Sequence, residues 1–149
     1  MRWNDRGSPI EPSEREPGDD DGTELAGVQI DVRRGPGCGC CSAWVVYLRS
    51  HGATVNIVDD ADRAAFRAGR GVPVEVASCH TATVFGYTIE GHVPVRAIER
   101  LLSAQPDAVG LALAAMPADS PGMGGDNTTW DRQAVQLIGP AGQLSAFDY

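Results

Sequence analysis

The segment VQIDVRRGPGCGCCSAWVVYL, residues 28–48, decides the fold of this chain. Apolar and polar residues alternate over residues 28–32, which predicts a strand with one buried face. Gly35-Pro36-Gly37 ends that strand. From Cys41 the apolar residues recur at i, i+3, i+4 and i+7, which predicts a helix that Gly52 ends. A cysteine cluster therefore lies between the first predicted strand and the first predicted helix.

The chain on the C-terminal side of this segment predicts further strands and helices. Predicted strands cover residues 54–58, 74–77 and 83–89, and a predicted hairpin joins residues 134–138 and 144–147. A short helix capped by Asp59 or Asp60 is predicted to run through Ala68 and to be closed by Gly69. A further helix is predicted to begin at Pro94, and its buried face comprises Val95, Ile98, Leu101 and Leu102. The order β-α-β-α-β-β-α is that of a thioredoxin-like α/β domain. Because such domains hold a cis-proline before the third strand, this analogy predicts a cis peptide at Val72-Pro73.

Composition divides the chain into two parts. Residues 1–26 combine Pro, Gly, Ser and acidic residues, which predicts a disordered acidic tail. Residues 27–149 then form one thioredoxin-like domain, with a Met-containing loop and the hairpin as its C-terminal extension. The apolar stretches are far shorter than the ~20 residues that a membrane-spanning helix needs. Residues 1–26 lack the apolar segment of a secretory signal, so the sequence as it stands predicts a cytoplasmic protein.

The charge distribution argues against two classes of partner. The net charge is −8, and all twelve basic residues are Arg. An acidic chain without a basic stripe is a poor ligand for nucleic acid or for an anionic membrane.

The cysteine cluster Cys38-Gly39-Cys40-Cys41 has the C-x-x-C spacing of a dithiol redox site with a third thiol inside it. A helix N-terminus favours the thiolate form of nearby cysteines. Three thiolates within one turn would repel each other, and a cation with high affinity for sulfur relieves that repulsion. The cluster therefore favours a metal site over a simple redox pair.

The other candidate donors indicate which metal this site takes. They are the adjacent pair Cys79-His80, then His92, and Met116 and Met123 in a loop rich in Pro and Gly. Thiolate, imidazole and thioether together form a soft ligand set that suits Cu(I). Zinc accepts Cys and His but gains little from Met, so it is the less favoured ion. Enough sulfur is present to hold more than one copper ion.

Each candidate ligand also has a plain structural interpretation. Cys38, Cys40 and Cys41 could form a disulfide, Cys79 could be a small buried apolar residue, and Met116 and Met123 could serve in packing. His80 could be a polar residue satisfied at a strand end, and His92 could be a loop or capping residue. These alternatives stay open on the sequence.

Five short motifs, taken together, resemble a family of small bacterial proteins that includes the CopG-type copper-resistance proteins. In order they are CGCC at residues 38–41 with Trp44, GVP at 71–73, SCHTA at 78–82, GYTIEGHVP at 86–94, and the methionines of Met116-Pro117 and Ser120-Pro121-Gly122-Met123. The resemblance covers about residues 28–149. It implies a thioredoxin-like fold and a role in tolerance of excess copper. It also implies copper ligands at Cys38, Cys40, Cys41 and Cys79, and further ligands at His80, His92, Met116 and Met123.

The residues leave open whether the protein is an enzyme. In the first hypothesis it binds Cu(I) and exchanges it with a donor or acceptor protein. In the second it is a thiol–disulfide or copper oxidoreductase, with Cys38 as the attacking thiolate and Cys41 as the resolving thiol. In the third it is a zinc-stabilised structural domain, which chelation would unfold. Members of the family are commonly exported, whereas this sequence shows no export signal.

Overall fold

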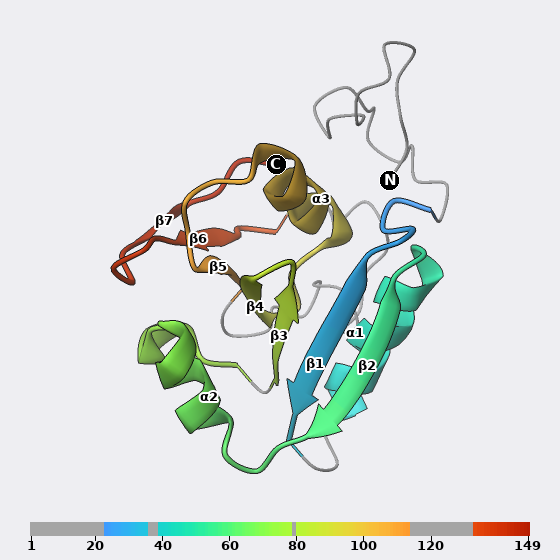
Figure 1. Cartoon of the computed structure of the whole chain (residues 1–149), viewed down its shortest axis with the longest axis horizontal. Coiled ribbons are helices and arrows are strands. Elements are labelled where there is room, and N and C mark those ends of the chain that lie inside the picture. The colour runs from blue at the N-terminus through green and yellow to red at the C-terminus, as the bar shows by residue number, and fades with distance from the viewer. Residues whose placement is uncertain (1–22, 36–38, 79, 114–132) are drawn as a thin grey trace.

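The computed structural model describes residues 23–35, 39–78, 80–113 and 133–149, with the side chains of residues 39–41 excluded. Within these residues, seven strands form a single sheet, and three α-helices cover its two faces (Figure 1). The elements are β1 (Gln29–Arg34), α1 (Gly39–Ser50), β2 (Thr54–Asp59), α2 (Arg63–Arg70), a 3-10 helix (Val74–Val76), β3 (His80–Val84), β4 (Tyr87–Gly91), α3 (Val95–Ala104), β5 (Gly110–Leu113), β6 (Gln136–Ile138) and β7 (Leu144–Ala146).

The sheet has the strand order β2-β1-β3-β4-β5-β6-β7. Strand β1 pairs in parallel with β2 and antiparallel with β3, and β3 pairs antiparallel with β4. A β-α-β unit followed by an antiparallel hairpin gives the four-stranded core of a thioredoxin-like domain, so the predicted fold class is confirmed. Strands β5, β6 and β7 extend this core at the β4 edge, and the predicted C-terminal hairpin corresponds to β6 and β7.

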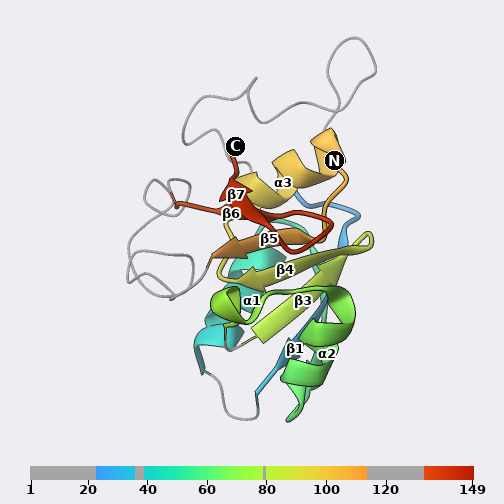
Figure 2. The same cartoon turned by 90° about the vertical axis from the view of Figure 1, so that its left-hand side faces the viewer.

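Alternate residues of the central strands face different helices. Ile30 and Val32 of β1 belong to the main apolar core together with residues of α1 and α3. Their neighbour Arg33 points to the other face, where its guanidinium lies 4.4 Å from the centre of the Phe66 ring in α2. Figure 2 shows α2 and α1 on opposite sides of the sheet. The site described below depends on both layers.

The fold begins earlier in the chain than its composition predicts. Glu24 and Leu25 are fully buried, and the Leu25 N–H donates to the carbonyl of His51 at the end of α1. The described part of the segment predicted as a tail, residues 23–26, therefore packs against the domain. No helix in the described ranges is long and apolar enough to cross a membrane.

Two predicted strands need correction. Residues 74–76 form a 3-10 helix in place of the strand predicted over 74–77, and Val74 is 86 % exposed. The strand predicted over 83–89 is interrupted at Phe85-Gly86, where φ is 46° and 85°. Two positive φ values in a two-residue loop define a type I′ turn, which joins β3 to β4. Apolar residues continue through that turn, so hydrophobicity alone did not reveal it.

The predicted cis peptide at Pro73 is also wrong. The described residues contain no cis peptide bond. Pro73 precedes the 3-10 helix and does not lead directly into β3. The analogy failed because it placed the third strand six residues too early, at residue 74 where β3 begins at His80.

The helices lie close to their predicted positions. The buried face of α3 includes all four predicted residues, Val95, Ile98, Leu101 and Leu102. Helix α2 begins later than predicted, with Asp62 as its N-cap, and ends at Gly71, whose φ is 80°. Strand β5 was not predicted, because its four residues are all buried and therefore lack the alternation that marks a strand.

Candidate metal centre

Two buried imidazoles lie side by side at the open end of the β3–β4 hairpin. His80 is the first residue of β3, and His92 directly follows β4. Both side chains are fully buried, and their ring centres are 5.1 Å apart with an angle of 29° between the planes. The sequence predicted both residues as ligands, and the antiparallel pairing of β3 with β4 brings them together.

Gly91 makes this pairing possible. Strict alternation along β4 would place His92 on the face that Glu90 occupies, away from His80. Gly91 has φ of 82°, a conformation that other residues adopt only at a cost, and the chain turns there. A Cβ on Gly91 would also stand 2.3 Å from the carbonyl oxygen of Leu113. Glycine is therefore required at this position for two independent reasons.

The hydrogen bond of His80 selects one of its ring nitrogens as a metal donor. Its Nε2 lies 3.0 Å from the carbonyl oxygen of Gly91. A carbonyl only accepts hydrogen bonds, so Nε2 carries the proton and, in a neutral ring, the lone pair lies on Nδ1. Histidines that bind metals commonly donate their other N–H to a backbone carbonyl in this way.

Trp44 connects the two imidazoles to helix α1. Its indole stacks on the His80 ring with 4.5 Å between ring centres, and its Nε1–H donates to the carbonyl oxygen of Val93 at 3.1 Å. The backbone of Cys40 and Cys41 forms the first turn of α1, which begins at Gly39. That turn lies about one helical pitch, ~5.4 Å along the axis, before Trp44. The start of α1 and the two imidazoles are therefore at the same end of the fold.

Several predicted ligands lie outside the described residues. These are Cys38, Cys79, Met116 and Met123, together with the side chains of Cys40 and Cys41. Within the described ranges, no three His, Cys, Asp or Glu side chains are grouped closely enough to hold a metal ion. The pair of His80 and His92 therefore needs further donors to complete a site, and the predicted sulfur ligands are of the chemical type that would supply them.

Two arginines near the start of α1 were not predicted as part of the site. Arg34 donates from Nη1 to the hydroxyl of Ser42 in the first turn of α1 at 2.8 Å, and from Nε to Asp59 at 3.0 Å. Arg63 lies against Gly35, where a Cβ would stand 2.9 Å from its Nη1 atom. Arginines are common on surfaces, so nothing in the sequence singles these two out.

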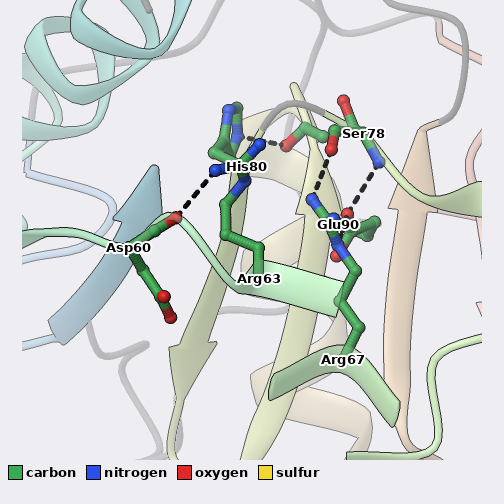
Figure 3. A network of polar contacts seen from close by, with 7 residues as sticks. Asp60, Arg63, Arg67, Ser78, His80 and Glu90 are labelled. Carbon is green, nitrogen blue, oxygen red and sulfur yellow. Dashed lines mark hydrogen bonds and ion pairs between the residues drawn. The ribbon is translucent and has the colours of Figure 1, made fainter. Parts of the chain in front are cut away.

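A buried polar network lies on the α2 side of the same strand ends (Figure 3). Arg67 reaches from α2 to the carboxylate of Glu90 on β4, with 2.6 Å between Nε and Oε1. Glu90 Oε1 also accepts from the N–H of Ser78 at 2.8 Å, and Arg67 Nη2 donates to the carbonyl oxygen of Ser78. Burial raises the pKa of Glu90, against the opposing effects of the Ser78 N–H, of Thr81 and of Arg67. The sequence analysis named none of these residues as functional.

The chain is similar to one protein family and to two solved structures. The family model described as a protein of unknown function, DUF411, matches residues 76–123, which include His80 and His92. Two solved structures of a protein called copper resistance protein CopG, forms 1 and 2, are each 38 % identical in sequence with a TM-score of 0.71. Each alignment covers 80 % of this chain and 94 % of the CopG chain. No curated protein matches the chain.

Proposed function

This chain belongs to the family of the copper resistance protein CopG, and from this membership we propose that it binds copper and acts in copper resistance. The ion is Cu(I), held by the cysteines of the C-x-C-C motif together with the imidazoles of His80 and His92. One observation carries the proposal: the buried, stacked pair of His80 and His92 lies at the end of the fold where α1 begins with Cys40 and Cys41.

The chemistry of these donors supports copper over harder ions. Thiolate sulfur and neutral imidazole are soft or intermediate ligands, which suit Cu(I). The bond between His80 and the Gly91 carbonyl fixes the ring tautomer and leaves Nδ1 as the donor. The proposed ligands beyond the motif and the histidines are Cys79, Met116 and Met123, and so many sulfur donors would allow more than one copper ion.

Arg34 and Arg63 contribute charge near the cysteine motif. Arg34 is bonded to Ser42, the residue directly after Cys41, and Arg63 packs on Gly35. Positive charge and a helix N-terminus both favour the thiolate form of cysteine, which is the form that binds metal. The charge of Arg34 is already paired with that of Asp59, so we expect Arg63 and the N-terminus of α1 to contribute more to the thiolate form.

A Cu(I) titration of the reduced, metal-free protein against a competing chelator tests the proposal. The variant C40S/C41S should lose affinity by roughly a hundredfold or more, about 2.8 kcal/mol or more. S50A, at the opposite end of α1, is the matched control and should bind like the unmodified protein. The same affinity in C40S/C41S and in the unmodified protein would contradict the proposal.

A second candidate function follows from the position of the cysteines. Cys40 and Cys41 form the first turn of α1 in a thioredoxin-like fold, where redox dithiols are active. In that case Cys38 attacks a disulfide of the substrate and Cys41 resolves the mixed disulfide. Turnover in a disulfide-reduction assay that is lost in C38S would support this function, and its absence favours metal binding.

A further inference from the structure

The ion pair between Arg67 and Glu90 has no role in the proposed function, yet it is among the most buried polar features of the described residues. The exposed fractions of the two side chains are 10 % and 0 %. Removing two charges from water is costly, so a buried ion pair often adds little to the stability of the fold. Its contacts indicate what it does.

Both backbone polar groups of Ser78 are bound by this pair (Figure 3). The Ser78 N–H donates to Glu90 Oε1 at 2.8 Å, and the Ser78 carbonyl accepts from Arg67 Nη2. Hydrogen bonds to charged groups are stronger than those between neutral groups. The direction of the chain is thus fixed two residues before His80.

The same pair also adjoins the residue that orients both imidazoles. Glu90 is directly followed by Gly91, whose carbonyl oxygen binds His80 Nε2 and whose turn places His92. The Ser78 hydroxyl oxygen lies 3.4 Å from the point where a Cβ on Gly91 would stand. Ser78 and Gly91 therefore pack against each other, and Ser78 is bonded to the carboxylate of Glu90.

We propose that Arg67 and Glu90 are positioning residues for the candidate metal centre. By fixing Ser78 and Gly91 from the α2 side of the sheet, they hold His80 and His92 stacked on the α1 side before an ion arrives. The proposal rests on the proposed function for its consequence, which is tighter metal binding. Its structural part, the alignment of the two rings, can be tested without metal.

The test compares two variants of α2. R67M/E90Q removes both charges, so that neither is left buried alone, and it breaks the contact with the Ser78 carbonyl while a glutamine oxygen stays near the Ser78 N–H. R70M is the matched control. Arg70 lies one turn further along α2 and makes two bonds to the other end of the hairpin, to Thr88 Oγ1 at 3.0 Å and to the Gly86 carbonyl at 2.7 Å.

The first measurement is the imidazole carbon–proton NMR spectrum of reduced, metal-free protein. The ring currents of Trp44 and His92 shift the signals of His80, because its ring stacks on both of theirs. In R67M/E90Q the signals of His80 should move or broaden, whereas those of His51, held by Glu24 at the far end of α1, should not. R70M should leave all of these signals in place.

The second measurement is Cu(I) affinity against a competing chelator. R67M/E90Q should bind at least about tenfold more weakly, as is common when a residue that orients a metal ligand is lost, while R70M should stay within about twofold of the unmodified protein. Unchanged affinity in a folded R67M/E90Q variant overturns the proposal, and so do unchanged His80 signals.

A further variant and the NMR comparison without metal test the proposal even if R67M/E90Q does not fold or the protein binds no copper. If R67M/E90Q does not fold, R67K retains the charge opposite Glu90 but not the planar fork that binds two partners. R67K should move or broaden the His80 signals, and an unchanged spectrum overturns the proposal. If the unmodified protein binds no Cu(I), the proposed function fails, and the NMR comparison still decides whether the pair aligns the rings.

Discussion

The two ends of the β3–β4 hairpin differ sharply, although helix α2 contacts both. At the open end Arg67 forms an ion pair with the fully buried carboxylate of Glu90, and the imidazoles of His80 and His92 are stacked on each other. At the turn end Arg70 binds the Gly86 carbonyl, and Phe85 is 69 % exposed. The open end is constrained by polar and ring contacts on both faces of the sheet, whereas the turn end only reverses the chain. Substitutions should therefore have different consequences at the two ends.

The largest expected effect is that of G91A at the open end. An alanine there would adopt an unfavourable φ and place its Cβ 2.3 Å from the Leu113 carbonyl oxygen, so β5 must move away from β4. We expect a loss of at least about 3 kcal/mol in the free energy of unfolding, measured by denaturant unfolding.

G86A is the control for this substitution at the turn end. Gly86 has nearly the same φ, 85°, but a Cβ there would have no neighbour within 4 Å. The cost should be only that of the backbone conformation, about 1 kcal/mol. Equal costs for G86A and G91A would show that the two ends are constrained alike.

A smaller effect of opposite sign is expected for F85N. Phe85 adopts φ of 46° in the type I′ turn, and Asn-Gly is the preferred pair for such a turn. The variant should be more stable by about 0.5–1 kcal/mol, visible as a higher midpoint of denaturant unfolding. Its Cu(I) affinity should not change, because Phe85 lies at the end of the hairpin away from the imidazoles. Lower stability would mean that the Phe85 ring makes a contact that outweighs its backbone strain.

The smallest effect concerns pH and Tyr87, next to the turn. Burial, and then the charge of Asp107, raise the pKa of Tyr87, whose hydroxyl donates to the Pro106 carbonyl at 2.8 Å. A raised folded-state pKa means that the stabilisation is complete below the unfolded value, ~10, and is lost as the pH rises through the folded value. As the pH rises above the unfolded value of ~10, the unmodified protein should therefore lose slightly more stability than Y87F. The same pH dependence of stability in both proteins would contradict a raised pKa for Tyr87.

Much of the fold could be predicted from short-range patterns. The alternation before Gly35 and the helical spacing after Cys41 place β1 and α1 correctly, because both patterns depend only on neighbouring residues and on which face meets the core. The prediction failed at the 3-10 helix and at the Phe85-Gly86 turn. In both places the apolar residues suggested a continuous strand, whereas contacts with the rest of the fold set a different backbone conformation.

The candidate site was predicted in part. His80 and His92 were named as ligands, and they are adjacent in the structure. The ligand roles of the histidines, cysteines and methionines stay predictions, as do the compartment and any copper donor or acceptor protein. The role of Trp44 as a stacking partner of His80 could not be read from the sequence, where Trp44 stood out only as part of the first motif.

The sequence by itself determined which chemistry is available: a thiol-rich turn at a helix start, two histidines, and the order of strands and helices. The tertiary structure alone decided which groups meet. Strand register pairs the ends of β3 and β4, the turn at Gly91 moves His92 to the face of His80, and α2 brings Arg67 to Glu90 across 23 residues of sequence. Local periodicity fixes the direction of a side chain relative to its own element. Contacts between elements depend on register and packing over the whole domain, which no short segment encodes.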